Sequence, residues 1–157
     1  MKAGIVVYSH TGNTLQVAEK LRESLAAQGH EADILRVHAQ NEDPNAKEPL
    51  KLTETPDVAP YDALFFGAPV YGFSLCPPMK AYLQQVGPLK GKRVGVFVTH
   101  HFPMAWLGGN RSARQMAALC ESKGAKPGAS AVVNWSGKDR DGQIRDAVGA
   151  LGAGVKA

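Results

Sequence analysis

The chain is 157 residues long, and its 44% hydrophobic and 20% charged residues are typical of one globular domain with a buried core. It holds no apolar run near the ~20 residues of a transmembrane helix, and the short apolar stretch after Lys2 leads into a polar loop, so we predict no membrane span, no signal peptide and a cytoplasmic location. The formal net charge of +4 favours anionic partners, but the basic residues are scattered and form no recognition motif, which argues against nucleic acid.

Short apolar runs alternate with helical patterns along the chain. Nearly continuous apolar runs are typical of parallel strands covered on both faces, and they predict strands at residues 3–8, 31–37, 63–67, 94–98 and 129–133. Apolar residues at helical spacing predict helices at residues 14–28, 77–86, 110–123 and 139–151. Gly29 lies where glycine ends helices, Pro77 and Pro78 suit the first turn of the second helix, and the chain from Gly152 onward is expected to fray.

Residues 38–60 interrupt this alternation. They contain prolines at positions 44, 49, 56 and 60, together with several acidic residues. Because prolines spaced this closely are incompatible with a long helix, we expect an irregular crossover with at most one short helical piece. The alternating pattern continues on both sides of this segment, so it is not a domain boundary, and residues 1–157 are expected to form a single domain.

The alternation of strands and helices predicts the topology. Parallel strands need crossover connections, and these are almost always right-handed. Five such strands in a chain of this length predict an α/β fold with a doubly wound five-stranded parallel sheet in the order 2-1-3-4-5 and three layers. Ligands of such sheets bind beyond the carboxyl ends of the strands, at the switch point. The candidate site therefore lies in the loops after the first, third and fourth strands.

The polar turn after the first strand is a candidate phosphate site. It places hydroxyl and amide side chains before a helix, whose first N–H groups lack intrahelical partners and carry about half a positive charge. The turn contains no Lys or Arg, so a phosphate would be held by neutral donors. The alternative is an ordinary turn in which Asn13 or Thr14 caps the helix. The residues of the turn are Ser9, His10, Thr11, Gly12, Asn13 and Thr14.

This turn resembles the phosphate loop of flavodoxin-like FMN proteins, Ser/Thr-x-Thr-Gly-x-Thr, through Ser9, Thr11, Gly12 and Thr14. Neither G-x-x-x-x-G-K-[ST] nor G-x-G-x-x-G follows the first strand. The resemblance covers nearly the whole chain and weakens between residues 38 and 60 and at the C-terminus. It implies a flavodoxin-like fold and FMN as the cofactor, with the protein holding and tuning the flavin. Electron carriers of this family are usually acidic, which this chain is not.

The loop after the third strand carries an aromatic residue followed by glycine. The resemblance implies that Tyr71 stacks on the isoalloxazine and that the Gly72 peptide turns toward the flavin N5. The pattern Gly67-x-Pro69-x-Tyr71-Gly72, followed by a Pro-led helix, also resembles flavin and quinone reductases of the same superfamily. The alternative is a strained loop with Tyr71 in the core. The cofactor contacts expected from this loop are Pro69, Val70, Tyr71, Gly72 and Phe73.

The loop after the fourth strand contains histidines, aromatic residues and a glycine pair. Thr99 would offer its hydroxyl or backbone at the flavin edge, and one of the two following histidines would donate to the flavin O2 or N1 region. A metal site on these histidines lacks a nearby carboxylate or cysteine and is not predicted. Contact of Trp106 with another subunit is an equal alternative to flavin contact. The expected cofactor contacts are Thr99, His100, His101, Trp106, Gly108 and Gly109.

The two cysteines, Cys76 and Cys120, lie far apart and form neither a disulfide framework nor a zinc cluster. Reduced thiols are expected, which suits the cytosol. Cys120 falls in a helical pattern and is expected in the core, whereas Cys76 lies near the candidate site, where packing is favoured over a redox role. Residues 135–137, Trp-Ser-Gly, receive no role.

Three functions remain open. The first is an FMN-binding redox protein that transfers electrons to partner proteins, which the short chain and the absence of a nicotinamide signature favour. The second is an NAD(P)H-dependent quinone or flavin reductase, which the aromatic loop after the fourth strand favours; such reductases often build the site across a homodimer. The third is an interaction module that no longer binds FMN. No catalytic residue is assigned.

Overall fold

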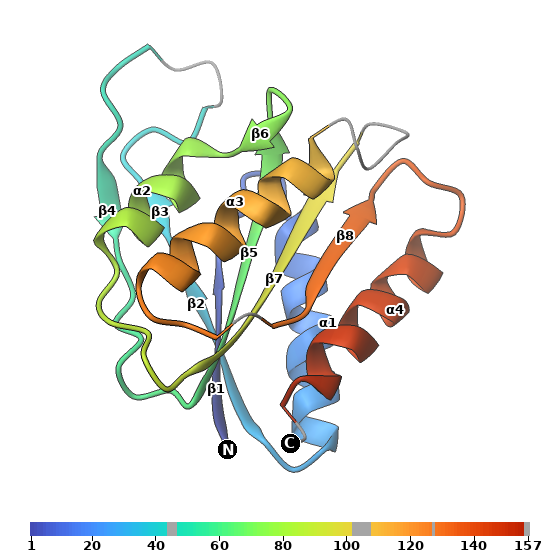
Figure 1. The fold of residues 1–157 in the computed structure, drawn as a ribbon. Coiled ribbons are helices and arrows are strands. Elements are labelled where there is room, and N and C mark those ends of the chain that lie inside the picture. The colour runs from blue at the N-terminus through green and yellow to red at the C-terminus, as the bar shows by residue number, and fades with distance from the viewer. Residues whose placement is uncertain (44–46, 102–107, 127, 156–157) are drawn as a thin grey trace.

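Five parallel strands form the central sheet in the order β2-β1-β5-β7-β8 (Figure 1). The structure is a computed structural model that describes residues 1–43, 47–101, 108–126 and 128–155. The parallel strands are β1 (Lys2–Val7), β2 (Glu31–Arg36), β5 (Ala63–Tyr71), β7 (Arg93–His100) and β8 (Ser130–Asn134). Counted along the chain, these strands follow the order 2-1-3-4-5, so the predicted doubly wound topology is confirmed.

Helices cover both faces of the sheet and give three layers (Figure 1). On one face α1 (Asn13–Ala27) packs against α4 (Arg140–Ala153). On the other face α2 (Pro77–Gln85) packs against α3 (Gly109–Ser122). None of the helices in the described part of the chain is long and apolar enough to cross a membrane.

The sheet is buried on both faces because its strands are apolar almost throughout. Ile5 and Val7 of β1 belong to the apolar cluster beneath α1 and α4, whereas Val6 and the following Tyr8 belong to the cluster beneath α2 and α3. Successive side chains of a strand point to opposite faces. An unbroken apolar run therefore fills both clusters, and the loops at the strand ends are left to carry polar chemistry.

Two strands extend beyond the apolar runs that predict them. β5 continues to Tyr71, where the sequence predicts a loop, and its last two residues pair with the short antiparallel strand β6 (Ser74–Leu75). Residues 69–74 thus form a hairpin, and the predicted loop is wrong here. β7 likewise includes Thr99 and His100, because both pair with β8. In both places a neighbouring strand supplies hydrogen-bond partners for the backbone N–H and C=O groups, so the strand continues beyond its apolar residues.

The segment from 38 to 60 contains a small antiparallel sheet of β3 (His38–Ala39) and β4 (Leu52–Glu54). Its described part forms no helix, which agrees with the predicted irregular crossover. The carbonyl of Pro56 accepts a hydrogen bond from the Tyr82 hydroxyl at 2.6 Å. Val58 is buried in the cluster that α2 and α3 cover. These contacts fix the crossover against α2.

The C-terminal helix continues further than the sequence predicts. α4 ends at Ala153, and Val155 beyond it is only 3% exposed and packs in the cluster beneath α1 and α4. The expectation that the chain frays from Gly152 is therefore wrong for residues 152–155, and residues 156–157 lie outside the described part of the chain. The start of the helix is fixed by Asp139, whose carboxylate accepts a hydrogen bond from Gly142 N at 3.3 Å.

Candidate functional site

The carboxyl ends of β1, β5 and β7 lie side by side and border a cavity of about 130 Å³. Trp106 lies outside the described residues, so its contact stays a prediction. The predicted residues Gly12, Gly72, Phe73, Gly108 and Gly109 do not line this cavity. Each described residue of its wall belongs to the set predicted from the sequence, and these residues are Ser9, His10, Thr11, Asn13, Thr14, Pro69, Val70, Tyr71, Thr99, His100 and His101.

The turn after β1 folds around the buried hydroxyl of Ser9. Its Oγ accepts hydrogen bonds from Gly12 N at 3.1 Å and Leu15 N at 3.3 Å. Gly12 has a φ of 94°, a left-handed conformation that glycine adopts readily. Among the described residues, none accepts a hydrogen bond from the N–H groups of Asn13 or Thr14. These two donors are left for a ligand at the positive end of α1.

Two side-chain contacts join this turn to the end of β7. The Thr14 and Thr99 hydroxyl oxygens lie 2.8 Å apart, and both side chains are buried. One hydroxyl donates to the other, so the second hydroxyl hydrogen of the pair remains available to a ligand. At the surface, Asn13 Nδ2 lies 3.2 Å from His101 Nε2. The loops after the first and fourth parallel strands therefore form one continuous wall.

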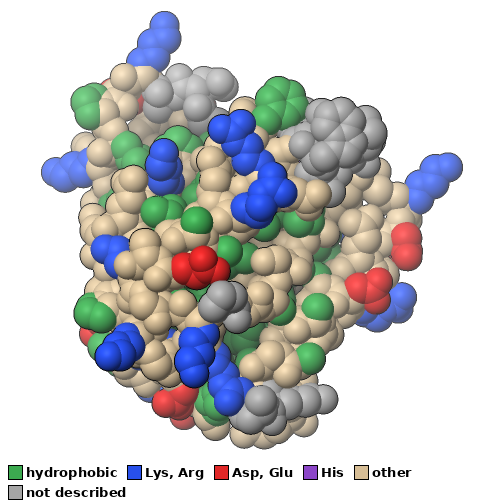
Figure 2. Space-filling view, viewed as in Figure 1, with side chains coloured by type: hydrophobic (Ala, Val, Ile, Leu, Met, Phe, Trp, Pro, Cys, Tyr) green, Lys and Arg blue, Asp and Glu red, His purple; other side chains and the backbone are tan. Residues whose placement is uncertain are grey.

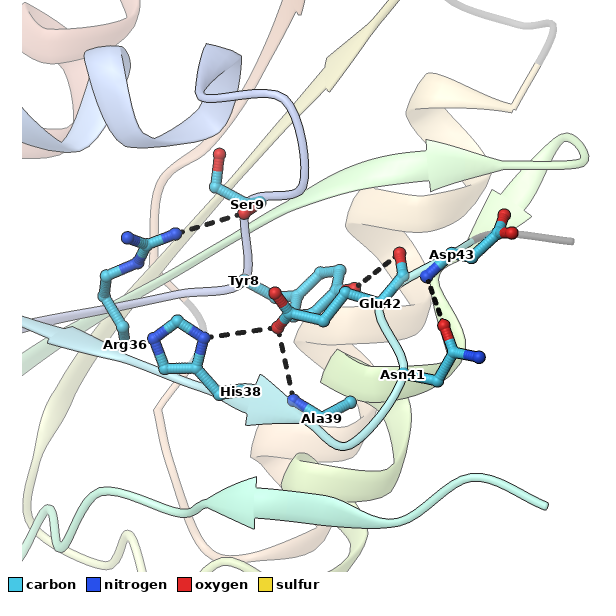
Figure 3. A network of polar contacts seen from close by, with 8 residues as sticks. All are labelled: Tyr8, Ser9, Arg36, His38, Ala39, Asn41, Glu42 and Asp43. Atoms are coloured by element: carbon cyan, nitrogen blue, oxygen red, sulfur yellow. Dashed lines mark hydrogen bonds and ion pairs between the residues drawn. The ribbon is translucent and has the colours of Figure 1, made fainter. Parts of the chain in front are cut away.

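Arg36 brings a positive charge to the outer side of the turn (Figure 3). It is the last residue of β2, it pairs with Val7 of β1, and its Nη2 donates to the carbonyl of Ser9 at 3.2 Å. The Nε of Arg36 is buried and has no partner among the described residues. Arg36 is absent from the predicted site, although its place at the end of the strand beside β1 is a signal that the sequence contains.

The hairpin after β5 and the start of α3 are tightly packed. Gly72 and Phe73 have φ values of 56° and 65°, as in tight hairpin turns with two left-handed residues. A Cβ on Gly108 would lie 2.6 Å from Phe73 Cα, and one on Gly109 would lie 3.3 Å from the Cδ2 atom of His100. Both glycines thus allow α3 to begin directly against the site, which is a packing role.

Residues 135–137, which received no role from the sequence, support the histidines. Trp135 N donates to the carbonyl of His100 at 2.7 Å, and Ser136 Oγ lies 2.7 Å from the carbonyl oxygen of His101. The Arg140 guanidinium lies 4.7 Å from the centre of the Trp135 ring. The loop after β8 therefore holds the backbone of the loop after β7. This support became visible only with the pairing of β7 and β8, which brings the two loops together.

A second, larger cavity of about 540 Å³ shares Tyr71 with the first. Tyr8 also lines it, and burial, followed by the nearby Glu42 carboxylate, raises the Tyr8 pKa to about 12. Burial, followed by the effect of Tyr8, also raises the pKa of Tyr71. Both phenols are therefore neutral near pH 7. Tyr71 lies in the walls of both cavities, whereas Glu42, Asp43 and Glu48 line only the larger one.

Glu42 organises the far wall of this larger cavity (Figure 3). One of its carboxylate oxygens accepts from Ala39 N at 3.2 Å and lies 3.2 Å from His38 Nδ1. Its carbonyl accepts a hydrogen bond from the Tyr8 hydroxyl at 3.5 Å. Residues 38–60 carry no periodic apolar pattern, so this wall could not be predicted from the sequence.

Both cysteines are buried, and burial raises each thiol pKa to about 12. Cys76 is fully buried in the cluster beneath α2 and α3, and Cys120 is 1% exposed in the same cluster. Both remain neutral thiols near pH 7, which favours the packing interpretation of Cys76. Among the described residues, no group of three or more His, Cys, Asp or Glu side chains is placed to hold a metal ion.

The first cavity has the donor set for a phosphate monoester. Its described wall contains hydroxyls, amides and the two N–H groups of the α1 start, with no Asp or Glu. A negative charge at this helix end is favoured by the helix dipole. The volume of about 130 Å³ is below the ~300 Å³ of ordinary small-molecule pockets, so the cavity has room for a phosphate group but not for a whole mononucleotide.

Comparisons with solved structures find flavodoxins with the same fold. The flavodoxin of Streptococcus pneumonia TIGR4 has a TM-score of 0.69 and 21% identity, with 99% of this chain and 100% of that chain covered. A mutant flavodoxin from Pseudomonas aeruginosa has a TM-score of 0.71 and 17% identity, with 100% of both chains covered. Two-electron-reduced flavodoxin from Megasphaera elsdenii has a TM-score of 0.69 and 23% identity, with 96% of this chain and 98% of that chain covered.

A comparison with curated protein sequences finds no match. The family described as Flavodoxin-like fold matches residues 1–153 of the chain. Because that match spans nearly the whole sequence and the sheet order agrees with it, this protein belongs to the flavodoxin-like family.

Proposed function

We propose that this protein binds FMN and transfers electrons to a partner protein. Membership of the flavodoxin-like family implies this cofactor. The observation that supports it in this chain is the pair of uncommitted N–H groups on Asn13 and Thr14, at the start of α1 and beside a cavity wall without carboxylates. A phosphate monoester supplies the negative acceptor oxygens that these donors lack.

Different residues of the cavity would contact different parts of FMN. The turn from Ser9 to Thr14 would hold the phosphate, with Ser9 Oγ keeping the turn in shape through its bonds to Gly12 N and Leu15 N. Thr99 would extend the wall from the phosphate toward the ring. The ring itself would lie between the β5–β6 hairpin and the loop after β7.

FMN, when bound, supplies the redox chemistry, since it accepts and releases electrons one or two at a time. The described wall of the first cavity contains no carboxylate, and such a wall disfavours an added negative charge less than an acidic pocket does. Tyr71 lies between this wall and Glu42, Asp43 and Glu48, which line only the larger cavity. Gly72 lies at the hairpin tip with a left-handed φ of 56°. Because glycine has no side chain, the peptide group there is open to a ligand.

Binding of FMN and of riboflavin, measured by quenching of flavin fluorescence, tests the proposal. The two ligands differ only in the phosphate, so we expect FMN to bind at least about tenfold more tightly, which corresponds to ~1.4 kcal/mol. Asn13→Asp adds a carboxylate beside the two free N–H groups and should weaken FMN binding. It should leave folding intact, because an acidic residue suits the first turn of a helix.

Gln16→Glu is the matched control, since it adds the same charge to α1 at an exposed position outside the cavity. It should leave FMN affinity almost unchanged. A folded wild-type chain that binds neither flavin would overturn the proposal and favour the interaction module that has lost its FMN.

The larger cavity favours a second candidate, an NAD(P)H-dependent quinone or flavin reductase. Its volume of about 540 Å³ is within the usual range for small-molecule pockets, and it meets the first cavity at Tyr71. Steady oxidation of NAD(P)H by the FMN-loaded protein in the presence of a small quinone would favour this candidate. A homodimer, a cytoplasmic location and a single domain over residues 1–157 remain predictions that belong to either candidate.

A further inference from the structure

We propose that the start of α3 and the neighbouring α2 form a basic docking surface for an acidic electron-transfer partner. This inference rests on the proposed redox function and adds to it the location and the charge of the partner. We define the basic surface by the exposed side chains of Lys80, Arg111 and Arg114.

Charge is segregated along the sequence in a way that the net charge of +4 conceals. Residues 63–120 contain no Asp or Glu, and their charged residues are Lys80, Lys90, Lys92, Arg93, Arg111 and Arg114. This stretch forms β5, β7, α2 and α3, and therefore two of the three loops around the site. Figure 2 shows Lys and Arg side chains gathered over the part of α3 that lies toward the β5–β6 hairpin.

The basic surface begins directly at the site. Gly109, the first residue of α3, packs against the ring of His100, which lines the first cavity. The helix start is held to the hairpin by Gln115, whose side-chain oxygen accepts from Ser74 Oγ and Leu75 N, both at 2.9 Å. Arg111 lies in the first turn of this helix and Arg114 in the second. A partner that contacts these arginines would lie next to the cofactor edge.

The arginines are placed against the preference of the helix. The N-terminal end of a helix is positive, and cations there are unfavourable, whereas acidic residues are favourable. The first turn of α3 nevertheless contains Arg111 and no acidic residue. Glu121, near the other end, is the first carboxylate of α3. Local stability therefore does not explain this charge, but attraction of a negatively charged surface does.

The larger cavity beyond Tyr71 has the opposite net charge. Its described lining contains three acidic residues, Glu42, Asp43 and Glu48, and one basic residue, Lys51. An acidic partner is repelled from that side and attracted to the start of α3, which gives the encounter one orientation. A basic partner would experience the reverse. Complementarity of this kind mainly changes the rate of association and its dependence on salt.

The test uses one acceptor in two charge states: native cytochrome c, which is basic, and succinylated cytochrome c, whose lysines carry carboxylates. The FMN-loaded protein is reduced anaerobically with stoichiometric dithionite and mixed with either acceptor. Two ferric haems each gain one electron from one fully reduced flavin, and the protons released by the flavin enter the solvent. At low ionic strength we expect the succinylated form to be reduced about tenfold faster, with the advantage lost in high salt.

The double variant Arg111→Gln/Arg114→Gln should reduce the succinylated form several-fold more slowly than the wild type does. The urea midpoint of this variant should be equal to that of the wild type or higher. Arg22→Gln/Arg145→Gln is the matched control, because it removes the same charge from exposed positions on α1 and α4. Faster reduction of native cytochrome c, or equal slowing by both double variants, would overturn the docking surface.

A failure of FMN binding is recognised separately, by the absence of flavin absorbance. In that case titration calorimetry with the flavin-free chain and ferric succinylated cytochrome c still measures docking. We expect binding that weakens with salt and with the Arg111→Gln/Arg114→Gln substitutions. The absence of any such binding would contradict the basic surface independently of the flavin.

Discussion

The hydroxyl oxygens of Thr14 and Thr99 lie 2.8 Å apart in the interior, and this contact joins the start of α1 to the end of β7. The two residues are 85 positions apart in the chain, yet both line the same cavity. Both residues are almost fully buried, so each hydroxyl relies mainly on the other for a hydrogen bond within the protein. This pair couples the geometry of the phosphate turn to that of the loop after β7.

We expect Thr14→Val to destabilise the protein by about 1–3 kcal/mol, because it leaves the Thr99 hydroxyl buried without its partner. Thr14→Val/Thr99→Val should cost less than the sum of the single substitutions, since it removes both polar groups. Urea denaturation of the four proteins in the cycle measures this. Additive losses would show that the two hydroxyls act independently.

Arg36 should act on the phosphate end of a flavin and not on its ring. Arg36→Gln removes a charged donor to the Ser9 carbonyl, and we expect FMN affinity to fall about tenfold, as loss of ~1.4 kcal/mol implies. Riboflavin affinity should change little, and Arg36→Lys should restore part of the loss. Equal weakening of both flavins would indicate that the substitution distorts the whole turn instead.

Two glycines with open space around them should respond oppositely to alanine. Gly12 has a φ of 94°, and Gly149 lies within α4, and neither has an atom within 4 Å of an added Cβ. Gly12→Ala should lower the free energy of unfolding by about 1–2 kcal/mol because of left-handed strain. Gly149→Ala should raise it by about 0.5–1 kcal/mol because alanine favours helices. Thermal unfolding of both variants provides the comparison, and a harmless Gly12→Ala would contradict the left-handed turn.

The buried thiols should make the fold sensitive to alkali. Cys76 and Cys120 have pKa values near 12 in the folded protein against an ordinary 9.0, so above pH 9 the unfolded chain binds fewer protons. The free energy of unfolding should therefore fall as the pH rises from 9 toward 12, by up to about 1.4 kcal/mol per pH unit for each thiol. Below pH 9 this contribution is fully present.

Urea titrations at pH 8 and at pH 10, on the wild type and on Cys76→Ala, measure this effect. The free energy of unfolding should fall less between the two pH values for Cys76→Ala than for the wild type, because the variant lacks one of the titrating thiols. As an independent readout, a thiol-specific reagent at pH 8 should leave both cysteines of the native protein unmodified. Rapid reaction of one thiol would mean that its surroundings open in solution.

The fold could be predicted from local patterns because the sheet is buried on both faces. Continuous apolar runs such as residues 3–8 and 94–98 are a direct consequence of that burial. The ends of strands are different, because pairing with a neighbour can extend a strand through polar residues. Tyr71 and Thr99 therefore lie in strands, although the residues around them resemble loops.

Most of the cavity wall could be predicted because strand order places three loop ends together. Arg36 and Ser136 lie outside this wall and contact the carbonyls of Ser9 and His101; strand order brings Arg36 close to the turn but does not show either contact. Such contacts depend on the register of neighbouring strands and on side-chain rotamers. Neither quantity leaves a periodic trace in the sequence.

The sequence by itself determined the strand order, the position of the polar turn from Ser9 to Thr14 and the absence of acidic residues from 63 to 120. These are properties of residue type and of local spacing. Only the tertiary structure decided which N–H donors at the start of α1 lack a partner among the described residues, that Tyr71 lines both cavities, and that the start of α3 packs against Phe73 and His100. The physical reason is that hydrogen-bond partners and close approaches are set by distances in space between residues far apart in the chain.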